Sequence, residues 1–432
     1  SKTKNRYIAL SENHFNQMTS DTKKNIIKYF LTDINVFISV YLSFFSLSWI
    51  TFKLTGSPAA LGTIGFAQNL PFLLFSIYGG VLADRYDRKS NVIKCNIGLT
   101  LVTIVSIILV VTDLLSFPLI LLMGFSLGSV FALNYPSMIG LVKDIVTDKQ
   151  EFPRVMGAAA SNAKIGQVAA SSTFSLLFAA FAAVGTFATA LLANLIALVS
   201  IILLKKPKQL PNPESDSVKV QFVTGIKYVF HYRPLLAVVL ISTMISIVFG
   251  FVTFQLPIID ADFLKGGSKA LGILYLAGAV GGLASGIYMS RRKSTKNILR
   301  FLIICAFISG ISITGIALSR NIVTTFIFAM GVDFAFIAAM GINNTVLQML
   351  TEEPKRGRVL GVNTSFNWGV MALVIMALGY LAKYLGMEIT IIIVGAITIA
   401  SGFVFAFVMK KQMPVLEQMY KDRGVEAGHE PF

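Results

Sequence analysis

The sequence predicts an all-α membrane protein of twelve transmembrane helices, arranged as two parallel repeats of six helices. Three observations lead to this fold class. Hydrophobic residues make up 55% of the 432 residues and charged residues only 13%, whereas soluble domains carry about 25% charged residues. The apolar residues fall into runs of about 20, the length that crosses a bilayer. Motifs of the first half also recur in the second half at a constant offset.

The twelve apolar runs define the predicted helices in order along the chain. They begin near Lys28, Pro58, Asn91, Ser116, Val155, Val184, Leu235, Lys269, Ile298, Ile322, Val359 and Met387. The stretch between the sixth and seventh runs, residues 205–219, holds three prolines and mixed charges, which indicates a linker.

Five segments of the chain follow from this division. We predict a cytoplasmic N-terminal segment at 1–27, helical bundles at 28–204 and 234–410, a cytoplasmic linker at 205–233 and a cytoplasmic tail at 411–432. Within the linker, residues 225–233 are expected to form a short amphipathic helix at the membrane surface.

Basic residues are distributed unevenly between the two sides of the predicted membrane. When loops are assigned to alternate sides, 31 of the 37 Lys and Arg residues fall on one side and five on the other, and Lys164 lies within a run. The positive-inside rule then places both termini in the cytoplasm. The net charge of +16 is thus first a topology signal and does not indicate nucleic-acid binding. A secondary interpretation is binding of anionic lipid at the cytoplasmic face.

The beginning of the chain is polar and basic. Residues 1–28 lack the apolar stretch of a cleavable signal peptide. The first membrane helix is therefore expected to serve as an uncleaved signal.

The internal repeat has an offset of 204 residues. Thr147, Arg154, Val155, Gly157 and Ser161 align with Thr351, Arg358, Val359, Gly361 and Ser365. At the same offset, Arg88 and Lys89 align with Arg292 and Lys293, but Asp84 aligns with Tyr288. Both matches have the same offset, the same order along the chain and the same side of the membrane. A chance match caused by the biased amino-acid composition therefore explains them poorly. Only the first half keeps the acid.

A short charged turn joins the second and third predicted helices. It reads Gly-Gly-Val-Leu-Ala-Asp-Arg-Tyr-Asp-Arg-Lys over residues 79–89. This stretch resembles the same loop of major facilitator superfamily transporters, whose pattern is Gly-x-Leu-Ala-Asp-Arg-x-Gly-Arg-Lys. The matching residues are Gly80, Leu82, Ala83, Asp84, Arg85, Arg88 and Lys89, whereas Asp87 replaces a glycine. The resemblance implies the major facilitator fold, with substrate bound between the halves near the midplane.

The resemblance also implies that this turn is a conformational gate. Asp84 can pair with Arg88, and in the superfamily the acid meets the start of the eleventh helix, near residues 357–359. That contact would close the cytoplasmic side. The gate is expected to comprise Asp84, Arg85, Arg88, Lys89 and Arg358. Two alternatives stay open: the bases of the turn only fix topology, and Arg358 lies in a solvated inside-positive loop.

Three ionisable residues lie inside predicted helices, where a charge costs at least about 2.5 kcal/mol at the helix centre and marks function by default. They are Asp33, Lys164 and Asp333. Asp33 or Asp333 could titrate and couple proton entry to transport, and Lys164 could attract an anionic group of the substrate. Alternatively, Lys164 neutralises an acid in a structural pair. The resemblance implies that helices one, four, seven and ten line the cavity, which supports Asp33 and Asp333 as cavity residues.

Polar and aromatic residues gather on helices expected to line the cavity. They are Tyr41, Phe44, Phe45 and Ser48 on the first, Asn134 and Tyr135 on the fourth, Phe254 and Gln255 on the seventh, Asn343 and Asn344 on the tenth, and Asn367 and Trp368 on the eleventh. Aromatic walls with few polar groups suit a bulky amphipathic ligand. Taken singly, such residues more often serve packing or interhelical hydrogen bonds.

Further stretches indicate a branch of the superfamily. Residues 49–62, 67–71, 225–236 and 347–359 resemble the enterobactin-exporter and macrolide-efflux branch, and the resemblance covers about residues 31–409. It implies proton-coupled efflux, by antiport, of a siderophore or a bulky drug-like compound. Uptake of a siderophore-like organic anion, a lysophospholipid flippase and a substrate sensor without transport are the alternatives. The sequence carries no sign of direction.

Enzymatic activity and cofactors are not expected. The chain lacks the Gly-x-x-x-x-Gly-Lys-Ser/Thr nucleotide motif, its three His are scattered, and its two Cys lie in apolar runs that argue against a disulfide. The expected partners are a small-molecule substrate, protons and the lipid bilayer, with no nucleic acid. The expected form is a monomer in the inner membrane of a bacterium.

Overall fold

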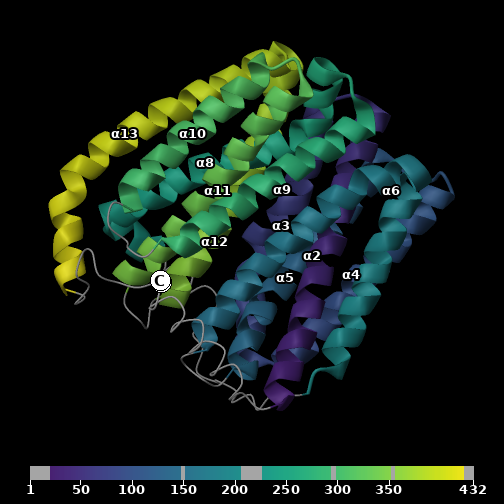
Figure 1. Cartoon of the computed structure of the whole chain (residues 1–432), viewed down its shortest axis with the longest axis horizontal. Coiled ribbons are helices and arrows are strands. Elements are labelled where there is room, and N and C mark those ends of the chain that lie inside the picture. Colours follow the sequence, from purple (N-terminus) through teal and green to yellow (C-terminus); the bar gives the residue numbers. More distant parts are fainter. Residues whose placement is uncertain (1–19, 147–150, 206–225, 293–297, 352–355, 423–432) are drawn as a thin grey trace, which may run out of the picture.

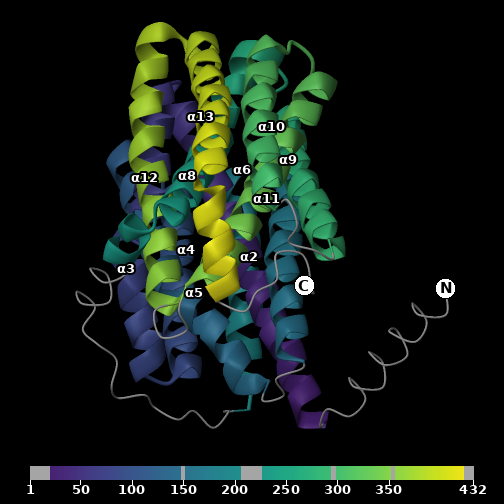
Figure 2. The ribbon, with the colours of Figure 1, turned by 90° about the vertical axis from the view of Figure 1, so that its left-hand side faces the viewer.

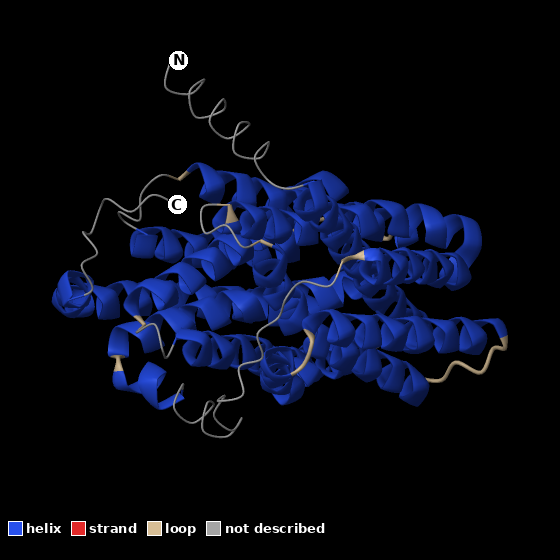
Figure 3. Ribbon diagram, turned by 90° about the horizontal axis from the view of Figure 1, so that it is seen from below, coloured by secondary structure: helices blue, strands red, loops and turns tan. Residues whose placement is uncertain are grey.

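A computed structural model describes residues 20–146, 151–205, 226–292, 298–351 and 356–422. These residues are helical apart from short connections, and they contain no strand (Figure 3). The predicted all-α fold class is therefore confirmed.

The first half of the chain contains five named helices. They are α2 (Ser20–Thr55), α3 (Pro58–Arg85), α4 (Arg88–Val111), α5 (Phe117–Ile145) and α6 (Phe152–Leu203). The second half begins with a short helix at 226–231. It continues with α8 (Arg233–Ile259), the π-helical turn η1 (Asp260–Leu264), α9 (Gly267–Arg291), α10 (Ile298–Leu318), α11 (Ile322–Leu350), α12 (Arg356–Leu385) and α13 (Met387–Asp422).

Helix α6 joins the predicted fifth and sixth segments. Its 52 residues are broken at Ala182, where φ is 50° and ψ is −151°. The sequence predicts two helices here, and the structure separates them by this one residue rather than by a loop. In the part of the chain that the structure describes, eleven segments are long and apolar enough to cross a membrane, including residues 180–203. The predicted span over the first part of α6 stays a prediction.

Local sequence signals explain several helix ends. Ser57 caps α3, because its Oγ accepts from the amide of Ala60 at 3.4 Å, and Pro58 follows as the first helical residue. Asn321 caps α11 in the same way through the amide of Thr324 at 3.0 Å. These caps lie at the end of the bundle where α2 ends and α3 begins, which we call the opposite end. The other end carries Arg85, Arg88 and Lys89, and we call it the basic end.

The helices run side by side in two groups (Figures 1 and 2). In the first half, α6 packs along α2 and α4, and α5 packs along α3 and α4. In the second half, α10 packs against α13 and α11, and α11 packs against α9. The most extensive contact between the halves is α3 with α12, followed by α6 with α9.

Glycines bring α3 and α12 into backbone contact at the opposite end. A Cβ added to Gly62 would lie 2.8 Å from the carbonyl oxygen of Ile375 and 3.1 Å from the Cα of Gly379. Gln255 of α8 closes the same region by donating from Nε2 to the carbonyl oxygen of Pro58 at 3.0 Å. Farther along, the hydroxyls of Ser76 and Ser365 lie 2.8 Å apart.

The halves separate towards the basic end. Figure 1 shows the two groups of helices close together at the upper right and farther apart below, where α13 ends at the left and α2 begins at the bottom centre. Gly80 on α3, Gly286 on α9 and Gly361 on α12 have open space where a side chain would be. The halves are therefore in backbone contact at the opposite end, and their helices diverge towards the basic end.

Candidate functional site: an aromatic pocket between the halves

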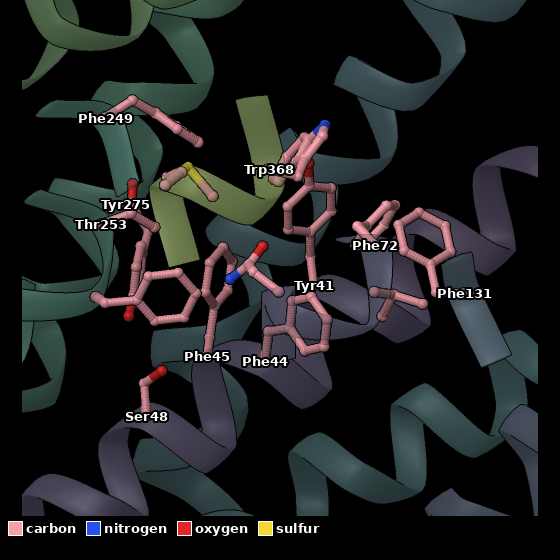
Figure 4. A pocket seen from close by; sticks show the side chains of 14 residues that line it. Tyr41, Phe44, Phe45, Ser48, Phe72, Phe131, Phe249, Thr253, Tyr275 and Trp368 are labelled. Atoms are coloured by element: carbon pink, nitrogen blue, oxygen red, sulfur yellow. The ribbon is translucent and has the colours of Figure 1, made fainter. Parts of the chain in front are cut away.

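A pocket lies between the two halves, and nine of the residues that line it are aromatic. The first half contributes Val40, Tyr41, Phe44, Phe45, Ser48, Asn69, Phe72 and Phe131, and the second half contributes Phe249, Thr253, Phe254, Tyr275, Trp368 and Met371. Figure 4 shows their side chains directed towards a common space from several helices. A site shared by both halves changes whenever the halves move relative to each other.

Stacked rings connect the halves across this pocket. Phe45 of α2 stacks on Tyr275 of α9 with ring centroids 3.9 Å apart and planes at 20°. Phe72 of α3 stacks on Trp368 of α12 at 5.2 Å and 23°. Such pairs contribute about 0.5–1.5 kcal/mol beyond the burial of their area. They hold the pocket walls together in this conformation.

The cavity is small and nearly apolar. Its volume is about 60 Å³, which at roughly 10–15 Å³ per water admits a few water molecules. A drug-sized ligand needs about 300–1,000 Å³, so the rings must move apart to admit one. Ser48, Asn69 and Thr253 supply polar groups, and no charged side chain occurs among the described residues that line the cavity.

The predicted cavity residues divide into groups. Tyr41, Phe44 and Trp368 line the pocket, as do Phe45, Ser48 and Phe254. Gln255 instead closes the opposite end through Pro58. Asn134 is fully buried on α5 without a hydrogen-bond partner in the described structure, and Tyr135 beside it is 40% exposed. Asn344 is half-buried on α11.

Asn343 and Asn367 belong to a buried polar network within the second half. The side-chain amides of both donate to Oδ1 of Asn363 at 2.9 Å. Oδ1 of Asn367 accepts from the hydroxyls of Thr243 at 3.1 Å and Ser246 at 3.3 Å. The network joins α8, α11 and α12 through side-chain hydrogen bonds, which favours one packing of these helices. These two asparagines therefore make interhelical hydrogen bonds beside the pocket rather than lining it.

The intramembrane acids lie outside the pocket lining. Asp33 is buried on α2 and accepts from Nδ2 of Asn162 on α6 at 3.1 Å. Asp333 is buried at the middle of α11 and faces α9, where a Cβ on Gly278 would lie 2.5 Å from its Oδ2. The side chain of Lys164 lies outside the described residues. Neither acid lines the aromatic pocket, although Asp333 lies within electrostatic range of the pocket residue Tyr41.

At the charged turn, Arg88 and Lys89 bind other helices of the first half. Arg88 donates from Nη1 to Oδ1 of Asp144 on α5 at 2.5 Å. The ammonium of Lys89 donates to the carbonyl oxygens of Ile202 at 3.0 Å and Leu204 at 2.5 Å. A cation at a helix C-terminus complements the helix dipole, so Lys89 stabilises the end of α6. These contacts give both bases a structural role.

The remaining gate residues are only partly described. Arg85 is exposed at the end of α3. The side chains of Asp84 and Arg358 lie outside the described residues. In this conformation the chain at Gly80 and at Gly361 faces open space, so α3 and α12 do not meet there. The predicted latch, which closes the basic end, stays a prediction.

Comparison with known proteins identifies the family. The family model described as transmembrane secretion effector, of the major facilitator type, matches residues 30–426. The chain belongs to this family. It is therefore a multi-pass membrane transporter and not an enzyme, and the resemblance drawn from the turn at residues 79–89 is confirmed.

Relatives of this chain with assigned names are distant. The staphyloferrin A transporter of Staphylococcus aureus is 21% identical over 394 residues, covering 90% of this chain and 98% of the relative. Macrolide efflux protein A of Streptococcus pyogenes is 24% identical over 282 residues, covering 61% of this chain and 66% of the relative. Similarity to siderophore and macrolide transporters agrees with the predicted branch.

Solved transporter structures share the fold. A crystal structure of the peptide transporter POT superposes with a TM-score of 0.75 at 11% identity, covering 92% of this chain and 95% of that chain. A bacterial homologue of the human lysosomal transporter Spinster superposes with a TM-score of 0.61 at 14% identity, covering 91% and 98%. At these identities the similarity concerns the fold alone.

Several residues of the pocket were not predicted from the sequence. Phe72 and Asn69 lie on α3, Phe131 lies on α5, and Tyr275 lies on α9. Helices α3 and α9 were not expected to line the cavity, whereas α11, which was expected there, contributes no described lining residue. With 34 Phe spread over the chain, an individual aromatic residue carries no signal of its role. The sequence also contained no indication of the contact between Ser76 and Ser365 that joins α3 to α12.

Proposed function

We propose that this transmembrane secretion effector is a secondary active transporter that exports a bulky amphipathic compound by alternating access, with protons as the coupling ion. The observation that carries the proposal is the aromatic pocket formed by both halves. Rings from α2, α3, α5, α8, α9 and α12 offer apolar area and stacking surfaces, which bind an apolar or aromatic body without demanding one shape.

Alternating access fits the two ends of the bundle. The backbone contact of α3 and α12 closes the opposite end, and the halves separate at the basic end. If the basic end faces the cytoplasm of a bacterium, as the positive-inside rule predicts, this conformation faces inward and takes substrate from the cytoplasm. Closing the basic end and opening the opposite end would then release the substrate outside.

The pocket chemistry favours a macrolide-like compound over a polyanionic siderophore. A polyanion needs Lys or Arg at its site, because burying an unpaired charge is costly. The described pocket lining has neither, while it offers nine aromatic side chains. Uptake of an organic anion is therefore the weaker alternative, although a relative is named a staphyloferrin A transporter.

For coupling, we propose Asp333 as the titrating group, with Asp33 as the second candidate. Both acids are buried at membrane depth, where a carboxylate is costly and protonation is favoured. Lys164, which the sequence places in the first part of α6, is proposed to lower this cost by pairing with one of them. Proton binding from outside would then alternate with substrate binding from inside.

The test is transport in proteoliposomes with an imposed pH gradient, using a radiolabelled macrolide and, separately, staphyloferrin A. Gradient-driven macrolide movement is expected, and Asp333→Asn should abolish its dependence on the gradient. Asp113→Asn is the matched control, because Asp113 is exposed at the opposite end in a left-handed conformation that Asn tolerates. Movement of staphyloferrin A alone would reject the substrate proposal, and unchanged pH dependence in Asp333→Asn would reject its coupling role.

A further inference from the structure

Two surface grooves at the basic end, one in each half, are separate from the aromatic pocket. We propose that each binds one anionic phospholipid of the surrounding membrane, with the headgroup held by Lys or Arg and an acyl chain along the apolar wall. The grooves have volumes of about 550 Å³ and about 480 Å³, within the range of ligand sites. They share no lining residue with the pocket, so the proposal does not depend on the transported substrate.

The first groove lies between α3, α4 and α5. Its rim carries Lys94, which is exposed, and Tyr86, which is 59% exposed. Asn91 fixes one wall, because its Nδ2 donates to the carbonyl oxygen of Leu82 at 2.9 Å. The floor is apolar and includes Gly98, where an added Cβ would lie 3.3 Å from the side chain of Val130. A larger residue than glycine would fill part of the groove.

The second groove lies at the end of α9. It is lined by Tyr288, which is 46% exposed, and by Arg291 and Arg292. Tyr288 packs on Phe301 of α10 with ring centroids 5.0 Å apart. The guanidinium of Arg292 lies 5.3 Å from the centre of the same Phe301 ring. This groove therefore combines an aromatic wall with two bases.

The two grooves occupy corresponding places in the repeat. The first groove lies where the second helix of its half ends and the third begins, beside the fourth helix, and the second groove lies at the end of the second helix of the other half. At the offset of 204 residues, Val130 of the first groove corresponds to Phe334, whose ring lies 6.2 Å from that of Tyr288. Each half thus keeps a tyrosine, a base and an apolar wall at one level, although the individual residues differ.

The surroundings of the grooves fit a lipid. The exposed face of α4 continues from Lys94 into Ile97 and Leu101, and the exposed face of α10 includes Ile304. Tyrosine beside a base is typical of the headgroup level of a bilayer. Exposed Lys and Arg at this level attract anionic lipid. A free phosphate would use the bases but not the apolar walls, so the combination favours a phospholipid.

Cys95 provides a probe of the first groove. It lies half-buried in the wall, whereas Cys305 is fully buried. In nanodiscs, phosphatidylglycerol should slow the labelling of Cys95 by a lipophilic maleimide relative to phosphatidylcholine alone. Lys94→Gln should weaken this protection about fivefold, the effect expected for one surface charge. Lys94→Arg should retain it. Lys410→Gln, an exposed base at the same end outside both grooves, should change nothing.

Native mass spectrometry tests both grooves together. The wild type should retain two phosphatidylglycerol molecules. Lys94→Gln should lose one, Arg291→Gln with Arg292→Gln should lose the other, and the combination should lose both. Equal Cys95 labelling in both lipids, or unchanged lipid counts in these variants, would overturn the proposal. Equal protection of Cys95 by inorganic phosphate would replace the lipid by a simple anion and overturn it as well.

Discussion

Helices α3 and α12 each carry a glycine near both ends, but the two helices are in contact at only one of these ends. At the opposite end, Gly62 and Gly379 bring the two backbones into contact, while at the basic end Gly80 and Gly361 face open space. On each helix the two glycines are 18 residues apart, which is five turns at 3.6 residues per turn. Each helix therefore presents a glycine on one face at both of its ends.

The register between the helices extends this comparison. Ser76 contacts Ser365 in the same antiparallel register as Gly62 with Gly379. One turn further, that register places Gly80 opposite Gly361. Close approach of helices in a membrane depends on small residues. Both ends therefore have the small residues that close contact needs, and only the conformation decides which end is in contact. Alternating closure requires this equivalence.

The largest effect is expected from Gly62→Leu. The nearest atoms to an added Cβ belong to the backbone of α12, so they cannot move independently of the helix. Overpacking of this kind costs about 1–3 kcal/mol, which shifts a two-state population about 5- to 150-fold. Electron-resonance distances between spin labels at Lys53→Cys and Lys383→Cys, in a Cys95→Ser, Cys305→Ala background, should lengthen. Labelled protein with unchanged distances would mean that Gly62 does not govern closure.

Gly80→Leu sharpens the comparison because it changes the same helix at its other end. It should leave the present conformation intact, since nothing lies within 4 Å of an added Cβ. It should nevertheless slow turnover by blocking closure of the basic end. Disulfide cross-linking of Gly80→Cys with Gly361→Cys should rise when Gly62→Leu is added, and Asp84→Asn should reduce that rise if the latch holds. Efficient cross-linking without Gly62→Leu would contradict the open basic end.

A smaller effect is expected from Tyr275→Ala, which removes the stack on Phe45 between α9 and α2. Loss of about 0.5–1.5 kcal/mol should lower the population closed at the opposite end about two- to tenfold. The matched control is Phe336→Ala. Its stack on Phe249 also has 3.9 Å between ring centroids but lies within the second half. The control should lower thermal stability without changing the spin-label distances. Equal shifts of these distances in both variants would mean that the Phe45–Tyr275 stack does not stabilise closure of the opposite end.

The smallest effect is expected from Gln255→Leu, which removes one hydrogen bond to Pro58. This bond is only partly buried, so a net loss of about 0.5 kcal/mol, the lower end of the range for a hydrogen bond, gives about a twofold shift towards the state open at that end. Gln68→Leu is the comparison, because the buried amide of Gln68 has no hydrogen-bond partner in the described structure. The same distance measurement should show no shift for Gln68→Leu. A larger shift there than for Gln255→Leu would contradict the role given to the Gln255 bond.

The helices could be predicted closely from the sequence. Runs of apolar residues predicted starts at Pro58, Ile322 and Met387 that coincide with the structure, because Pro58, Asn321 and Gly386 mark them. The break at Ala182 could not be predicted as a one-residue turn, since alanine favours helix. The nearest signal is Gly185, where an added Cβ would lie against the Cβ of Phe181 across the break.

The site was predicted less completely. Tyr41, Phe44 and Trp368 were found because their helices were expected to line the cavity, but Phe72 and Tyr275 come from helices that were not. Whether an aromatic residue faces lipid, core or cavity depends on the rotation of its helix about the helix axis. A segment that is apolar on all sides gives no indication of that rotation. The partner of Arg88 depends likewise on the distance between α4 and α5, and that distance follows from packing.

The connections at the opposite end are short throughout the described chain. Residues 56–57 join α2 to α3, residues 112–116 join α4 to α5, residues 319–321 join α10 to α11, and residue 386 alone joins α12 to α13. An antibody fragment raised against this face would find helix ends rather than loop epitopes. Because those ends move with the halves, a fragment bound across them would report the conformation directly and would trap one side of the transport cycle.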